Sequence, residues 1–220
     1  HYLAGYIANK RRNTLEADQQ FTLASERAPG NQALIENASQ FKLLYGDTEE
    51  AIALARHAKK AHSVFSALLL ATGDMKSQRY TDAIQHLNRA FKTQREASVT
   101  MVIAPMLMAW AKLGEGKTTE AISLLDAMHE QEATQALADY QLGLAYEYLE
   151  KYDLVEQYYN QALEQQLKPY HFILGQGSFY ARRGRVEAAQ KTFASYNANG
   201  YNPLFQKEEE ALAANNPDYF

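Results

Sequence analysis

A small residue recurs along the chain at intervals close to 34 residues. Alanine, or once valine, stands at Ala17, Ala51, Ala83, Ala121, Val155 and Ala188, with gaps of 34, 32, 38, 34 and 33 residues. Four residues after each of them come Phe21, Ala55, Leu87, Leu125, Tyr159 and Thr192. Because side chains four residues apart share one face of a helix, each pair marks an amphipathic helix. A period near 34 predicts a stacked array of helix-turn-helix units.

Each period divides into two helical segments joined by a short polar turn. The expected turns are Gly46-Asp47-Thr48, Gly114-Glu115-Gly116, Lys151-Tyr152-Asp153 and Arg183-Gly184-Arg185. Thr48 and Thr81 are the expected N-caps of the helices that follow, because a threonine side chain accepts a hydrogen bond from the first turn.

Two irregularities interrupt this pattern in the third period. Gly73-Asp74 precede Arg79-Tyr80, which predicts a long turn between the two helices. The gap of 38 residues between Ala83 and Ala121 predicts about four extra residues in a loop near Lys92 to Ser98.

These signals predict one continuous all-α array without separate domains, since no alternating strand pattern and no linker occur. The predicted repeats cover residues 1–30, 31–62, 63–97, 98–134, 135–168 and 169–200. Residues 201–220 form a predicted capping helix and tail, with Leu204, Phe205 and Leu212 facing inward. Tyr219 and Phe220 belong to a tail that we expect to fray or to insert into a neighbouring groove.

Composition excludes several classes of function. Hydrophobic residues make up 46% of the 220 residues, and the formal net charge is -4 without a basic block, so nucleic acid is not an expected partner. The absence of cysteine excludes disulfides and thiolate chemistry. No run of about 18 apolar residues predicts a membrane span. The chain begins at His1 within a helical pattern, which we interpret as a mature or trimmed fragment.

The sequence offers no motif for catalysis, a metal or a cofactor, and the chain is predicted not to be an enzyme. The six histidines lack the spacing of a metal site. Gly116-Lys117-Thr118 lacks the upstream glycine and the preceding strand of a phosphate loop, so an inter-helix turn is the preferred interpretation. Gly175-Gln176-Gly177 is interpreted in the same way, as small residues that aid helix packing.

The register resembles that of the tetratricopeptide repeat family. The fifth period matches its pattern at Leu142, Gly143, Tyr146, Tyr152, Tyr159 and Ala162. The first matches at Gly5, Ala17, Phe21, Ala24 and Pro29, and the fourth at Ala109, Ala121, Leu125 and Met128. This resemblance implies a right-handed α-solenoid of about six repeats. More loosely, residues 2–6 and 104–110 are similar to exported tetratricopeptide proteins of Gram-negative bacteria.

The same resemblance implies a groove, lined by the first helix of each repeat, that binds a protein or peptide. The candidate groove residues are Tyr2, Tyr6, Gln40, Phe65, Met106, Trp110, Tyr140, Leu144, Tyr148, Tyr170 and Tyr180. The alternative for each aromatic residue is packing in the core, which is common at helical spacing.

The candidate groove lacks the paired lysine and asparagine with which chaperone-binding members of the family hold a carboxylate terminus. The matching positions carry Tyr2 and Tyr6, Glu36 and Gln40, and Leu68 and Thr72. An apolar helix or an aromatic segment is therefore the expected ligand. The leading hypothesis is a non-catalytic binding scaffold. The alternatives are a self-associating assembly protein that uses the open repeat ends and a small-ligand sensor.

Overall fold

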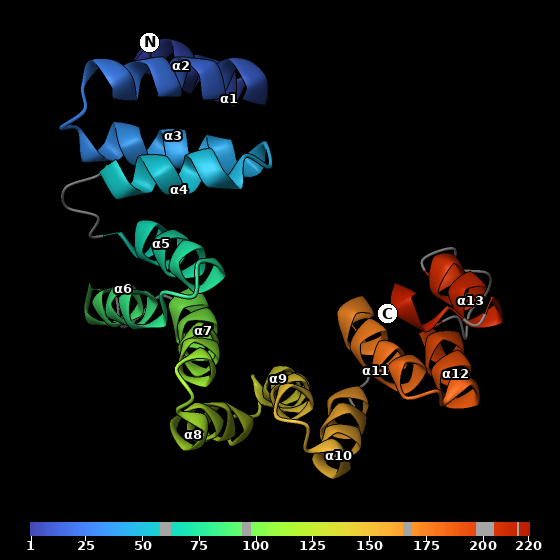
Figure 1. Cartoon of the computed structure of the whole chain (residues 1–220). Coiled ribbons are helices and arrows are strands. Elements are labelled where there is room, and N and C mark those ends of the chain that lie inside the picture. The colour runs from blue at the N-terminus through green and yellow to red at the C-terminus, as the bar shows by residue number, and fades with distance from the viewer. Residues whose placement is uncertain (58–62, 94–97, 165–168, 197–204, 215) are drawn as a thin grey trace. The chain divides into compact units, whose positions relative to one another are not determined.

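The computed structural model describes residues 1–57, 63–93, 98–164, 169–196, 205–214 and 216–220. Within these ranges the chain is all-α, with thirteen α-helices, a short 3₁₀-helix and no strand (Figure 1). It divides into two compact units, residues 1–121 and 122–220. The boundary between them lies within α8 (Thr118–His129).

Unit 1 is a succession of antiparallel helix pairs (Figure 1). The pairs are α1 (Tyr2–Lys10) with α2 (Thr14–Arg27), α3 (Gln32–Leu44) with α4 (Thr48–His57), and α5 (Val64–Lys76) with α6 (Tyr80–Thr93), followed by α7 (Ser98–Gly114). Each helix packs on the next one in the chain, so the apolar face of one pair is covered by its neighbour.

Unit 2, taken by itself, is also built from helix pairs. The helices are α9 (Gln135–Tyr148), α10 (Tyr152–Leu163), α11 (Tyr170–Arg182), α12 (Val186–Tyr196) and α13 (Gln206–Ala213), with the 3₁₀-helix η2 at Pro217–Tyr219. Its core includes Tyr159, Ile173, Phe193 and Phe205. Phe205 and Leu212 are buried as predicted, whereas Leu204 lies outside the described residues.

The recurring small residues are buried in the first five second helices. Ala17, Ala51, Ala83, Ala121 and Val155 are all fully inaccessible to solvent, which confirms the register there. The prediction for the sixth helix pair was wrong by one residue, because Ala189 is fully buried and Ala188 is only half-buried. The residue four positions further on is consequently Phe193, which is also fully buried, rather than Thr192.

The backbone torsion angles independently support this corrected register. Six residues that precede the second helices have φ between 58° and 82°, in the left-handed region. They are Arg12, Gly46, Gln78, Gly116, Glu150 and Gly184, each five residues before the buried residue of its second helix. The same tight turn therefore joins the two helices of all six pairs.

Three first helices place a glycine against the aromatic ring that lies sixteen positions later. Gly5 faces Phe21, Gly143 faces Tyr159 and Gly177 faces Phe193, and a β-carbon on any of these glycines would press on the ring. The same positions carry Ala71 with Leu87 and Ala109 with Leu125, all buried. A larger partner thus accompanies a smaller first-helix residue, as close packing requires.

The two predicted irregularities have a different structural form. Gly73 and Asp74 lie inside α5, and the turn that follows spans only residues 77–79, so the predicted long turn is wrong. Gly73 packs so closely on Ile52 that a β-carbon would stand 2.9 Å from its Cδ1 atom. The extra residues before Ala121 lengthen α7, whose 17 residues compare with 13 in α5. Part of the predicted loop, 94–97, lies outside the described residues.

The two predicted threonine caps were also wrong. The side chain of Asp47, not Thr48, accepts a hydrogen bond from the Glu50 amide at 3.3 Å and caps α4. Thr81 lies in the first turn of α6, where its hydroxyl donates to Glu115 Oε1 at 2.7 Å. With these threonines as caps the helices would begin at Glu49 and Asp82, whereas α4 begins one residue earlier, at Thr48, and α6 two residues earlier, at Tyr80.

Asp74 forms a buried ionic cluster in unit 1. Its carboxylate is 1% exposed and accepts hydrogen bonds from Arg56 and from Arg79, whose Nη2 lies 2.7 Å from Oδ1. His86 Nε2 lies 3.4 Å from Oδ2. Burial tends to raise the pKa of Asp74, but the hydrogen bonds and charges of Arg79 and Arg56 outweigh it and hold this pKa below its ordinary value. The cluster therefore ties α4, α5 and α6 together.

Candidate functional site

The exposed apolar side chains of unit 1 include several that lie on its first helices. Tyr2 and Tyr6 on α1 are 50% and 46% exposed, and Leu43 on α3 is 38% exposed. Gln40, half-buried, lies one turn before Leu43 and occupies in its repeat the place of Tyr6. We call Tyr2, Tyr6, Gln40 and Leu43 the unit 1 face.

The tyrosines of the unit 1 face are held by contacts that leave much of each ring exposed. The edge of Tyr2 meets the ring of Phe21, with the centroids 5.9 Å apart. Lys10 Nζ lies 5.5 Å from the centroid of the Tyr6 ring. Tyr2 is therefore positioned by α2 and Tyr6 by a residue of its own helix, while both rings remain accessible to another molecule.

The other predicted residues of unit 1 are less exposed. Phe65 is half-buried and packs against the core formed by residues that include Ile52 and Leu69. Met106 and Trp110 on α7 are also half-buried. Each of these three side chains is therefore partly buried and partly exposed to solvent.

In unit 2 the predicted residues separate into packed and exposed side chains. Tyr140 stacks on Phe172 with centroids 4.5 Å apart, and burial raises the pKa of its hydroxyl. Tyr170 stacks on Phe205 at 4.8 Å, and Leu144 packs against the same core. Tyr148, in contrast, is 62% exposed at the end of α9.

Tyr180 does not face a groove. Its side chain is buried, its hydroxyl donates to Glu156 Oε1 at 2.9 Å, and the guanidinium of Arg185 lies 4.5 Å from its ring. Burial, followed by the hydrogen bond to Glu156, raises the pKa of Tyr180 to about 12. In the corrected register of the sixth repeat, Leu174 and Ser178 occupy the places of Tyr2 and Tyr6, and both are half-buried.

An ion pair lies beside Tyr148. Glu147 Oε1 accepts hydrogen bonds from Arg182, with Nη2 at 2.5 Å, and Glu147 Oε2 accepts one from the buried Tyr159 hydroxyl at 3.1 Å. Burial, reinforced by the negative charge of Glu147, raises the pKa of Tyr159 far above its ordinary value. The contact joins α9 to α11 and fixes the end of α9 that presents Tyr148.

Sequence reasoning missed two exposed residues next to Leu43. Leu44 and Tyr45 end α3 and are largely exposed, and the Tyr45 hydroxyl lies 3.3 Å from Thr14 Oγ1. The signal was the run Leu43-Leu44-Tyr45 directly before a glycine turn, where a helix surface ends in apolar side chains.

The described residues contain no group of three or more His, Cys, Asp or Glu side chains that could hold a metal ion. In the same residues, no helix is both long enough and apolar enough to cross a membrane.

Helix pairs with one register and one recurrent turn define an all-α repeat fold of the tetratricopeptide type. The chain is similar to a tetratricopeptide repeat protein from Parabacteroides merdae ATCC 43184, at 16% identity and a TM-score of 0.72, over 96% of this chain and 81% of that one. This similarity confirms the predicted fold class.

Two structures of MamA also resemble the chain. One is 18% identical with a TM-score of 0.57, over 73% of this chain and 92% of MamA. The other is 17% identical with a TM-score of 0.59, over 76% of this chain and 96% of MamA. No family model and no curated protein matches the chain. At these identities the similarity shows the fold, and function has to be argued from the surface.

Proposed function

We propose that the chain is a non-catalytic scaffold that binds an apolar or aromatic segment of a partner protein through the unit 1 face. The observation that carries this proposal is the exposure of Tyr2, Tyr6 and Leu43 on two successive first helices. Tyrosines already positioned by packing contribute contact area at a low cost in side-chain entropy, and tyrosine is frequent among residues that dominate binding energy.

The chemistry of the unit 1 face favours an uncharged ligand segment. Lys42, the nearest cation on α3, is paired with Asp18 at 3.4 Å and with Glu50 at 2.7 Å. Its positive charge is therefore already compensated within the unit. The remaining cation, Lys10 beside Tyr6, is exposed on a flexible side chain, and its ammonium group can stay in water while an apolar segment covers the two tyrosine rings.

Tyr148 supports a second contact of the same kind in unit 2. It is exposed on a first helix, like the residues of the unit 1 face, and the Glu147–Arg182 ion pair beside it offers both a hydrogen-bond acceptor and a donor. We assign Tyr148 to a binding contact of unit 2 by itself.

The test compares two double variants within the first helix pair. Tyr2→Ala with Tyr6→Ala removes the rings of the unit 1 face. Leu15→Ala with Leu23→Ala removes two exposed apolar side chains from the second helix, α2. Both proteins are immobilised, their helical content is checked by circular dichroism, and partner capture from the native host is quantified by mass spectrometry.

The proposal predicts that the tyrosine variant loses specific partners by roughly tenfold or more, because truncating an aromatic anchor costs about 2 kcal/mol. The leucine variant should retain them. Equal capture by the two folded variants would remove the unit 1 face as the binding surface.

A further inference from the structure

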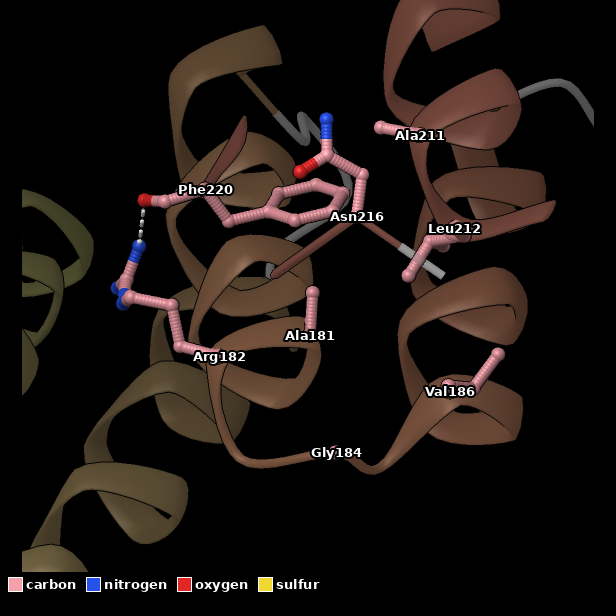
Figure 2. Close-up of a pocket in the computed structure, with 8 residues that line it drawn as sticks. All are labelled: Ala181, Arg182, Gly184, Val186, Ala211, Leu212, Asn216 and Phe220. Carbon is pink, nitrogen blue, oxygen red and sulfur yellow. Dashed lines mark hydrogen bonds between the residues drawn. The ribbon is translucent and has the colours of Figure 1, made fainter. Parts of the chain in front are cut away.

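A cavity of about 240 Å³ lies in unit 2 between α11, the start of α12, α13 and the last residues of the chain. Its walls are mostly apolar and include Ala181, Val186, Ala211 and Leu212. Figure 2 shows the ring of Phe220 lying across this space, with Arg182 on the α11 side. The cavity is separate from the unit 1 face and belongs to a single unit.

The chain's own last residues cover the cavity, contrary to the expectation that they fray or enter a neighbour. Arg182 Nη1 donates to the Phe220 carbonyl oxygen at 2.8 Å, shown by the dashed line in Figure 2. The Phe220 ring stacks on Phe193 with centroids 6.3 Å apart. The segment is therefore bound as a peptide is bound, by one aromatic side chain and one backbone carbonyl.

This segment occupies the cavity incompletely. Phe220 remains half-buried and Tyr219 is 44% exposed. Since a dry cavity of about 150 Å³ already accommodates benzene, the space left beside Phe220 has room for a further large side chain. A ligand that filled it would gain contacts that the chain's own segment does not make.

A buried carboxylate beside the segment also lacks a partner. Glu208 on α13 is 8% exposed, and its Oε1 accepts a hydrogen bond of 3.4 Å from the Tyr219 hydroxyl. Its Oε2 is buried without a hydrogen-bond partner among the described residues. Because a buried oxygen without a donor costs free energy, a ligand that supplies a donor here would bind more favourably than the Tyr219 hydroxyl does.

We propose that this cavity is a second peptide-binding site, and that residues 216–220 occupy it until a partner segment displaces them. The partner segment carries a ring larger than phenylalanine for the cavity, a backbone carbonyl for Arg182 and a hydrogen-bond donor for Glu208. A second copy of the chain is a poorer occupant, because its own residues 216–220 would leave the same space and the same carboxylate oxygen unsatisfied.

The test uses the full chain and two labelled peptides. One is residues 216–220, acetylated and amidated so that it presents carbonyls without terminal charges, and the other replaces its last residue with tryptophan. Phe220→Ala empties the ring position in the protein. Fluorescence anisotropy measures peptide binding, and circular dichroism verifies that the variant is folded.

We expect the Phe220→Ala protein to bind both peptides, the tryptophan peptide more tightly, and to bind each at least tenfold more tightly than the unsubstituted chain does. Adding Arg182→Ala should weaken binding roughly tenfold through the lost hydrogen bond. Adding Arg183→Ala is the matched control, because this exposed neighbouring arginine lies over the Tyr152 ring and does not line the cavity. This control should bind as before.

Failure of the folded Phe220→Ala protein to bind either peptide would overturn the proposal, as would binding that is indifferent to Arg182. Light scattering over a concentration series tests whether the last residues of a second copy of the chain bind in the cavity instead. If the unsubstituted chain forms dimers and the Phe220→Ala protein does not, a second copy is the occupant and the proposal of a partner segment is wrong. These outcomes are independent of the unit 1 face, whose tyrosines are unchanged in every variant.

Discussion

Gly143 lies directly against the ring of Tyr159, so that a β-carbon at residue 143 would stand 2.6 Å from the ring's Cδ1 atom. The Tyr159 ring is buried and its hydroxyl is hydrogen-bonded to Glu147, so the ring has little freedom to move away. The relationship recurs between Gly5 and Phe21, whereas Ala71 and Ala109 accompany the smaller Leu87 and Leu125. The size of the first-helix residue is thus matched to its partner on the second helix.

Gly143→Ala is therefore expected to destabilise the protein although alanine favours a helix. Overpacking costs about 1–3 kcal/mol, against a helix-propensity gain of about 1 kcal/mol, so the free energy of unfolding should fall by up to about 2 kcal/mol. Urea denaturation followed by circular dichroism measures this change.

The double variant Gly143→Ala with Tyr159→Leu reproduces the pair found in the third and fourth helix pairs. Its loss of stability should be smaller than the sum of the single losses, by roughly 1 kcal/mol, because the leucine leaves room for the new methyl group. Strict additivity would show that the two residues do not constrain one another.

Glu150→Gly is expected to stabilise the protein. Glu150 has φ of 58°, and this left-handed conformation costs a residue with a β-carbon about 1–2 kcal/mol, partly offset by the greater flexibility of glycine in the unfolded chain. The net gain should be about 0.5–1 kcal/mol in the free energy of unfolding.

Gly184→Ala is the reciprocal experiment at the equivalent turn. A β-carbon there would meet nothing within 4 Å, so any effect arises from the backbone at φ of 69°. We expect a loss of about 1 kcal/mol. Thermal denaturation of both variants tests the pair, and shifts in the same direction would contradict the assignment of these turns.

Asp74→Asn should destabilise the protein by about 1–3 kcal/mol, because the amide replaces a buried carboxylate that accepts hydrogen bonds from two arginines. The exposed pair Glu49–Lys76, at 2.5 Å, joins the same two helices, α4 and α5. Glu49→Gln is therefore a matched control and should change stability by less than about 0.5 kcal/mol. Equal losses in chemical denaturation would mean that burial of Asp74 is not the cause.

His86 makes the stability of the protein pH-dependent. Burial lowers the pKa of His86, and the charges of Arg89 and Arg56 add to this effect while Asp74 opposes it. The folded state then binds fewer protons than the unfolded state below about pH 6.5, so the free energy of unfolding decreases as pH falls through the lowered pKa.

His86→Gln should reduce this decrease, measured as urea midpoints between about pH 7.5 and 5. His57→Gln, on the exposed surface of α4, provides the control and should leave the pH profile unchanged. A profile for His86→Gln that matches the unsubstituted chain would rule out His86 as the titrating group.

The register of the helix pairs was predictable because it depends on a small buried residue at a fixed spacing. The prediction was wrong in the sixth helix pair, where two alanines, Ala188 and Ala189, are adjacent and the spacing alone could not decide between them. The signals that would have decided were Gly177 sixteen residues before Phe193 and Gly184 five before Ala189. The long turn predicted at Gly73-Asp74 was wrong for a related reason. A glycine that makes room for a neighbouring side chain and a glycine in a turn look the same in the sequence.

The candidate site was less predictable than the fold. Helical spacing places Tyr2 and Tyr140 at equivalent positions, fifteen residues before Ala17 and Val155, yet Tyr140 packs under Phe172 while Tyr2 stays exposed. What separates them is whether a neighbouring helix covers the ring, a long-range property that periodicity does not contain. The cavity beside Phe220 depends on a contact between residues 38 positions apart, Arg182 and Phe220, and has no local sequence signal.

The left-handed turn residues alternate along the chain, with Arg12, Gln78 and Glu150 in the odd helix pairs and glycine in the even ones. Because only a residue with a β-carbon is strained in that conformation, opening the turn relieves backbone strain in the odd pairs and costs them less free energy than it costs the even pairs. Backbone amides next to Arg12, Gln78 and Glu150 should therefore exchange with deuterium faster than those next to Gly46, Gly116 and Gly184. Local unfolding would then begin at every second turn instead of only at the two ends of the chain.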